Sequence, residues 1–143
     1  MKKELPKVYD PQAVESSIYQ MWMDGKCFHS EPDDSRKPFT IVMPPPNVTG
    51  QLHMGHALNK SIKDFMVRAA AMRGRYTPYI PGWDNHGMPI ESAIIKEQKL
   101  NRKKMSVAEF RTACHNYAQK YIDIQMEGFK RMGVLGDWGH PYK

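Results

Sequence analysis

The sequence is poor in cysteine and has no long apolar run. Cys27 and Cys114 are its only cysteines, and neither has partners at metal-ligand spacing. This argues against a zinc site or any other metal bound by the protein, and predicts two buried, reduced thiols. No apolar segment follows the basic N-terminus, which argues against a signal peptide, and no stretch is long enough to span a membrane. We therefore expect a cytoplasmic protein without a membrane partner.

The chain also has relatively little negative charge. Its 21 Lys and Arg residues exceed its 15 Asp and Glu residues, which gives a net charge of +6. This excess fits a polyanionic partner and fits plain solubility equally well. The basic residues are dispersed, without a dense tail or an RNA-binding stripe. With 143 residues, of which 41% are hydrophobic, the chain can form one domain or a large part of one.

Cap and turn residues divide the chain into strand-like and helical segments. Asp10 before a proline predicts a helix start, and Ser106 with Glu109 predicts a capping box. Gly25 and Gly74 are placed to end the first two helices. The expected segments are, in chain order, a helix over 11–24, a strand over 39–43, a helix over 55–72, a strand over 76–80, and helices over 89–99 and 107–132.

The order β-α-β-α-α predicts an α/β fold in which parallel strands are flanked by helices. Two strands are too few for a complete doubly wound sheet, so residues 38–143 are expected to form the first half of a larger nucleotide-binding domain. Residues 1–37 are expected to form an N-terminal helix and a lead-in loop. Two helices show apolar residues at steps of three and four. They are Leu58, Ile62, Phe65, Met66, Ala69 and Met72 in one, and Val107, Phe110, Cys114, Tyr117, Tyr121 and Ile124, expected to be buried, in the other.

Two histidines, His53 and His56, stand where the first strand turns into its helix. Free backbone N–H groups and the positive end of the helix dipole make such a junction an anion site. Two imidazoles added there indicate a phosphate whose charge changes during a reaction. Gly55 between them would let a flat base lie close to the backbone. The alternative is that one histidine caps the helix and the other is surface filler.

A second unusual loop carries Asp84, after the second strand, where α/β folds bind their ligands. Asp84 is a candidate ligand-binding carboxylate or a turn former. Trp83 is a core anchor or a pocket wall. The run from Pro44 to Asn47 forms a rigid, extended rim that can shape an apolar pocket or merely stiffen the strand exit. Asn59 is a further polar candidate.

Taken together, these motifs resemble the N-terminal catalytic segment of class Ia aminoacyl-tRNA synthetases of the valyl, isoleucyl and leucyl branch. The residues His53-Met54-Gly55-His56 are similar to the HIGH signature of that family, and residues 81–91 to its loop for the amino acid's ammonium group. The resemblance covers essentially the whole chain. It is composite: residues 5–54 are most similar to valyl enzymes and residues 56–143 to isoleucyl enzymes.

The resemblance implies the HIGH-motif half of a Rossmann-like catalytic domain, ending before an editing insertion. It implies ATP-dependent activation of isoleucine or valine to an aminoacyl-adenylate, with a lean to isoleucine. The nucleotide would carry Mg²⁺. His53 and His56 would be catalytic, and the family's motif positions carry over as follows. ATP would be bound by His53, Gly55, His56 and Asn59, and the amino acid by Pro45, Pro46, Asn47, Gly82, Trp83 and Asp84.

Alternative functions remain open at this point. The resemblance leaves the second half of the domain, its KMSKS loop and the anticodon-binding module without counterparts in these residues. The chain could therefore be a non-catalytic ATP- or adenylate-binding module, or one half of a split synthetase with a second polypeptide as partner. Another nucleotidyltransferase of the same superfamily is a further alternative, which the Asp84 loop disfavours. Binding of tRNA is possible but not indicated by charge alone.

Overall fold

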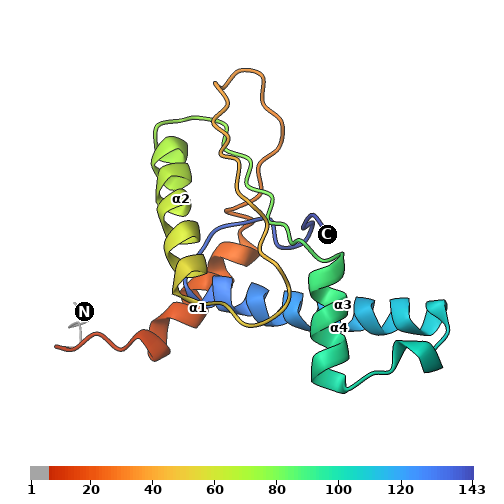
Figure 1. The fold of residues 1–143 in the computed structure, drawn as a ribbon. Coiled ribbons are helices and arrows are strands. Elements are labelled where there is room, and N and C mark those ends of the chain that lie inside the picture. The colour runs from red at the N-terminus through yellow and green to blue at the C-terminus, as the bar shows by residue number, and fades with distance from the viewer. Residues whose placement is uncertain (1–6) are drawn as a thin grey trace.

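The computed structural model describes residues 7–143, so the first six residues of the predicted lead-in lie outside it. Helices dominate the described part, and α4 runs along the base of the molecule (Figure 1). None of these helices combines the length and the apolar character that crossing a bilayer requires. The elements are α1 (Pro11–Asp24), α2 (Met54–Met72), α3 (Met88–Gln98), the 3-10 helix η1 (Arg102–Lys104) and α4 (Val107–Arg131).

The cap residues act as the sequence predicts. The Asp10 side chain accepts a hydrogen bond from the Gln12 N–H at the start of α1, and Gly25 caps its end. Ser106 and Glu109 form a complete capping box at the start of α4. Each cap satisfies backbone donors or acceptors that a helix end leaves free, so the helix boundaries follow from local chemistry.

The two predicted strands do not form. The extended segments lie parallel to one another, but between residues 7 and 143 they are joined only by isolated bridges (Figure 1). Proline is consistent with this correction: Pro38 and Pro44 flank the first predicted strand, Pro78 lies within the second, and each lacks the N–H that a ladder requires. The parallel bridges are Pro38 to Tyr76, Asn47 to Asp84, and Gly82 to Tyr142.

The core lies where the extended segments cross α4 and where α3 packs on α4. Trp83 is 2% exposed, and Phe129 of α4 is stacked on Trp138 with ring centroids 6.2 Å apart. Val48, from the loop before α2, is fully buried against this cluster. Burial of large apolar side chains supplies the main driving force, so α4 anchors both loops that carry the candidate site.

Some expected burial is wrong. Val107 and Ile124 of α4 are exposed, since α4 is covered on only part of its surface, and Cys27 is exposed in the turn after α1. The helical pattern over 55–72 is confirmed, yet its apolar stripe faces outward. The exposed members of that stripe are Leu58, Ile62, Phe65, Met66, Ala69 and Met72.

The inner face of α2 buries Val67 and Ala70 together with an ion pair. Asp64, 4% exposed, accepts a hydrogen bond from Arg68 Nε at 2.7 Å and one from the Leu135 N–H at 2.9 Å. Arg68 also donates to the Gly133 carbonyl. These polar contacts join α2 to the segment after α4, so they stabilise the orientation in which the face with Val67 and Ala70 turns inward.

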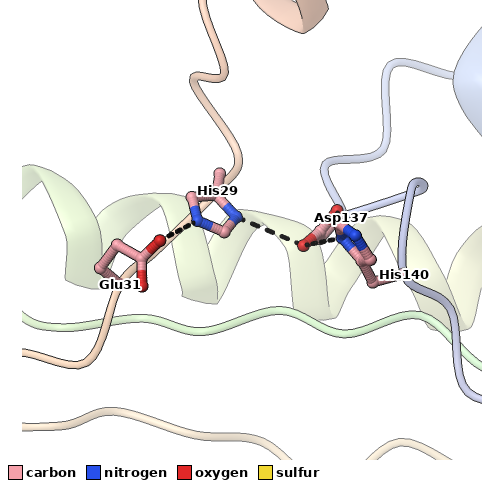
Figure 2. Close-up of polar contacts among 4 residues, drawn as sticks. All are labelled: His29, Glu31, Asp137 and His140. Carbon is pink, nitrogen blue, oxygen red and sulfur yellow. Dashed lines mark hydrogen bonds and ion pairs between the residues drawn. The ribbon is translucent and has the colours of Figure 1, made fainter.

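A second polar cluster ties the loop after α1 to the end of the chain. His29 contacts Glu31 at 2.7 Å and Asp137 at 3.3 Å, and His140 also contacts Asp137 (Figure 2). Hydrogen bonds to Glu31 and then to Asp137 raise the pKa of His29. The cluster lies outside the cavity described below and at the surface. We therefore assign it a structural role, in which it joins the loop after α1 to the end of the chain.

Candidate active site

A cavity of about 710 Å³ opens between the N-terminus of α2 and the proline-rich rim that precedes it. It brings together seven of the ten residues that the sequence indicated. Lys60, which the sequence analysis did not single out, also lines it. The predicted residues that line it are Pro45, Pro46, Asn47, His53, Gly55, His56 and Asn59.

The two histidines form the N-terminal capping box of α2. His53 Nδ1 accepts a hydrogen bond from the Gly55 N–H at 3.1 Å, and His56 Nδ1 accepts one from the His53 N–H at 3.3 Å. His53 does cap the helix, as the alternative interpretation held. His56 is not surface filler, because it completes the same capping box. Because each Nδ1 is an acceptor, the neutral rings carry their proton on Nε2. Within residues 7–143 no acceptor contacts either Nε2–H, so two donors are available to a ligand.

Gly55 keeps the imidazoles in place by having no side chain. A Cβ at this position would lie 2.8 Å from Cε1 of the His53 ring. The His53 and His56 ring centroids are 3.9 Å apart. A larger residue at position 55 would push His53 out of its cap, so glycine is required here for close packing within the site itself.

We expect His56 to make the chain less stable in acid. Burial, followed by the charges of His53 and Lys60, lowers the pKa of His56 below its usual 6.5. As the pH falls below 6.5, the unfolded chain takes up this proton before the folded chain, so the free energy of unfolding decreases. Protonation at Nδ1 would also remove a helix cap, which is worth on the order of 1 kcal/mol.

The measurement is urea unfolding of the parent and of His56→Gln between pH 5 and 8. Glutamine is a normal capping-box residue at this position and does not titrate. The parent should lose stability relative to the variant as the pH falls. Parallel pH profiles for the two proteins would show that His56 has no part in the acid sensitivity.

The Asp84 loop lies beside the rim of the cavity. The Asp84 N–H donates to the Pro46 carbonyl at 3.0 Å, and a parallel bridge joins Asp84 to Asn47. The Asp84 side chain is exposed. The backbone contact thus places the exposed Asp84 next to the rim, although Asp84 itself does not line the cavity.

Gly82 and Trp83 do not line the cavity. Trp83 is a core residue, and its Nε1–H donates to Gln125 Oε1 at 3.0 Å. A Cβ on Gly82 would lie 3.1 Å from Tyr142, whose carbonyl accepts the Trp83 N–H at 3.0 Å. Both residues therefore fix the position of the Asp84 loop without lining the cavity.

Gln125 of α4 is the main positioning residue that the sequence reasoning missed. It is 1% exposed, and its side-chain amide donates to the Asn47 carbonyl at 3.0 Å and the Gly50 carbonyl at 2.7 Å. With the bond from Trp83, one amide joins both loops of the site to α4. A glutamine on a helix with many polar residues gives no signal of this role, because its partners are distant in sequence.

The comparisons assign the fold to the class I aminoacyl-tRNA synthetases. The family model described as tRNA synthetases class I (I, L, M and V) matches residues 17–143. The chain therefore belongs to this family, which confirms the resemblance drawn from its two motifs.

The relatives are isoleucine–tRNA ligases. The chain is 50% identical over 130 residues to that of Bacillus subtilis, which covers 90% of this chain and 14% of the relative. It is 46% identical over 144 residues to that of Natranaerobius thermophilus, covering 99% of this chain and 15% of the relative. It thus spans about one seventh of the length of these relatives.

A solved structure shows the same fold. The chain matches the ternary complex of Agrobacterium radiobacter K84 LeuRS with tRNA and LeuAMS with a TM-score of 0.78 and 24% identity. The match covers 94% of this chain and 16% of that one. The fold of the described residues is therefore that of a Rossmann-like synthetase domain, although its parallel segments form no continuous strands here.

Proposed function

We propose that this chain forms the ATP side of a synthetase active site that activates isoleucine as an aminoacyl-adenylate. The observation that carries the proposal is the capping box at the head of α2, which leaves the Nε2–H of His53 and of His56 free beside a cavity. The family and the isoleucine-specific relatives support the substrate class. Residues 38–143 would be the HIGH-motif half of the catalytic domain, and residues 1–37 its N-terminal helix and lead-in.

The proposed reaction is a displacement at phosphorus. A carboxylate oxygen of the amino acid attacks the α-phosphorus of ATP, the bond from that phosphorus to the β-phosphate oxygen breaks, and pyrophosphate leaves. Negative charge grows on the phosphate oxygens during this step. Hydrogen-bond donors fixed in place before the reaction, such as the two imidazoles, stabilise that charge without reorganising. No protein nucleophile is needed, because positioning and charge stabilisation do the work.

The other residues would bind and orient the two substrates. Gly55 and Asn59 would contact the nucleotide, which carries its own Mg²⁺. Asp84 would hold the ammonium group, supported by the exposure of its carboxylate and its backbone bond to the rim. Pro45, Pro46 and Asn47 would line the side-chain pocket. Gly82 and Trp83 would act through the position of the Asp84 loop, because both lie behind it.

Valine would differ from isoleucine by one methylene, which an apolar pocket distinguishes by only about 1–3 kcal/mol. The relatives favour isoleucine. A tRNA partner belongs to the same proposal, as does cytoplasmic localisation. A second candidate function is an ATP- or adenylate-binding half that needs a separate polypeptide for catalysis.

The test is ATP binding by calorimetry together with ATP–pyrophosphate exchange in the presence of isoleucine, of valine, or of no amino acid. We expect saturable ATP binding and slow exchange that depends on the amino acid, with isoleucine preferred. Asp84→Asn should weaken the dependence on amino acid and leave ATP affinity within about twofold, because it removes the counter-charge of the ammonium group only. ATP binding without exchange would favour the binding module, and no ATP binding would contradict both.

A further inference from the structure

Lys60 is a buried cation at the inner end of the candidate ATP cavity. It lies in α2, is 7% exposed, and lines the same cavity as His53 and His56. Within residues 7–143, no carboxylate or other hydrogen-bond acceptor contacts its ammonium group. Lysine is among the residues least often buried unless it is paired. A buried lysine without a partner therefore indicates a binding site for an anionic ligand.

The helix directs Lys60 toward the histidines. It follows His53 by seven residues and His56 by four, so the three side chains share one face of α2. Long side chains on a helix lean toward its N-terminus, which here is the site. The charge of Lys60 also contributes to the lowered pKa of His56, as expected for neighbouring groups.

The nearest acidic residue on this face is already occupied. Asp64, one turn beyond Lys60, accepts bonds from Arg68 and from the Leu135 N–H. The Lys60 ammonium lies over the Phe129 ring, whose centroid is 5.7 Å away. Burial, followed by the charge of Lys63, lowers the pKa of Lys60. Within residues 7–143, no carboxylate therefore neutralises the Lys60 ammonium group.

We propose that the Lys60 ammonium binds phosphate oxygens of the nucleotide in this cavity, beside the free Nε2–H groups of His53 and His56. This inference rests on the proposed function, because it takes ATP as the ligand. An anion at this place would supply the missing counter-charge, and the helix N-terminus would add its own positive potential. Lys60 then helps to hold the phosphate chain while charge develops on it.

The competing role for Lys60 is structural, through its buried stem and its contact with Phe129. The two roles differ in what they predict for ligands without phosphate. A phosphate contact affects ATP and inorganic tripolyphosphate but spares adenosine. A structural role affects all ligands through the fold, and its loss lowers the melting temperature.

The experiment compares Lys60→Met and Lys60→Arg with the control Lys63→Met, which removes one charge from the same helix outside the cavity. Dissociation constants are measured for ATP, tripolyphosphate and adenosine. Lys60→Met should weaken ATP and tripolyphosphate by about 10- to 100-fold, leave adenosine within about twofold, and not lower the melting temperature. Lys60→Arg should recover part of the ATP affinity, and Lys63→Met should change it by less than about threefold.

The possible outcomes separate this inference from the proposed function. A parent that binds ATP while Lys60→Met binds it equally well would overturn the role of Lys60 alone. An equal loss for all three ligands, or a lower melting temperature, would assign Lys60 to the fold. A parent that binds tripolyphosphate through Lys60 but not ATP would keep the anion site and refute the proposed function. A parent that binds neither would refute both.

Discussion

Alanine at both His53 and His56 is expected to lower amino-acid-dependent pyrophosphate exchange by about 10²- to 10⁴-fold. The loss of one fixed donor to a developing oxyanion typically costs about 10²- to 10³-fold in rate. The two effects should combine less than additively, because the rings touch and share one capping box. ATP binding in the ground state should weaken much less than the rate falls, because the charge that these donors meet is largest in the transition state.

A matched variant separates catalysis from helix capping. His53→Ser with His56→Gln restores an ordinary capping box, without imidazoles, at the same two positions. We expect this variant to unfold at the temperature of the parent while its exchange remains as low as that of the double alanine variant. If the serine–glutamine variant recovered exchange, the histidines would be caps only. Full exchange by the double alanine variant would place the chemistry elsewhere.

Replacement of Gln125 by leucine is expected to lower the free energy of unfolding by about 3–5 kcal/mol. Leucine has a similar size, so the loss is of hydrogen bonds and not of volume. It would leave the Trp83 indole N–H and the Asn47 and Gly50 carbonyls without their partner. Each buried polar group left unsatisfied costs about 1–3 kcal/mol. This is a large part of the 5–15 kcal/mol that stabilises a typical domain.

The check is urea unfolding of Gln125→Leu beside Gln119→Leu, which makes the same change on the same helix. Gln119 bonds to Asp123 and Lys143 at the surface, so its replacement should cost less than about 1 kcal/mol. Equal destabilisation by the two variants would show that the Gln125 amide does not join the loops to α4. Gln125→Leu should also weaken ATP binding, because the rim of the cavity depends on that amide.

Local chemistry in the sequence predicted the helices well. Asp10, Ser106 and Glu109 are caps whose effect depends only on residues within a few positions, so they could be identified without tertiary information. The turn with His53 and His56 and the rim from Pro44 to Asn47 were also identified from local sequence, without tertiary information. The cavity brings them together as the sequence indicated, although their roles toward ATP and amino acid remain predictions.

Interactions between distant residues could not be predicted. The Asp64 carboxylate accepts a bond from the Leu135 N–H, 71 positions away, which helps to fix the inner face of α2. Gln125 bonds to Trp83, which is 42 positions away, and to Asn47, which is 78 positions away. The predicted strands reflect local side-chain preference, whereas a ladder requires backbone partners that are distant in sequence, and within residues 7–143 these form only isolated bridges.

The bridge between Gly82 and Tyr142 affects where a tag or label can be attached to the protein. Tyr142 donates its N–H to Pro81 and accepts from Trp83, one residue before Asp84. An affinity tag, a dye or a fused protein joined to Lys143 would begin one residue from this contact. Any pull or crowding there would be transmitted to the Asp84 loop.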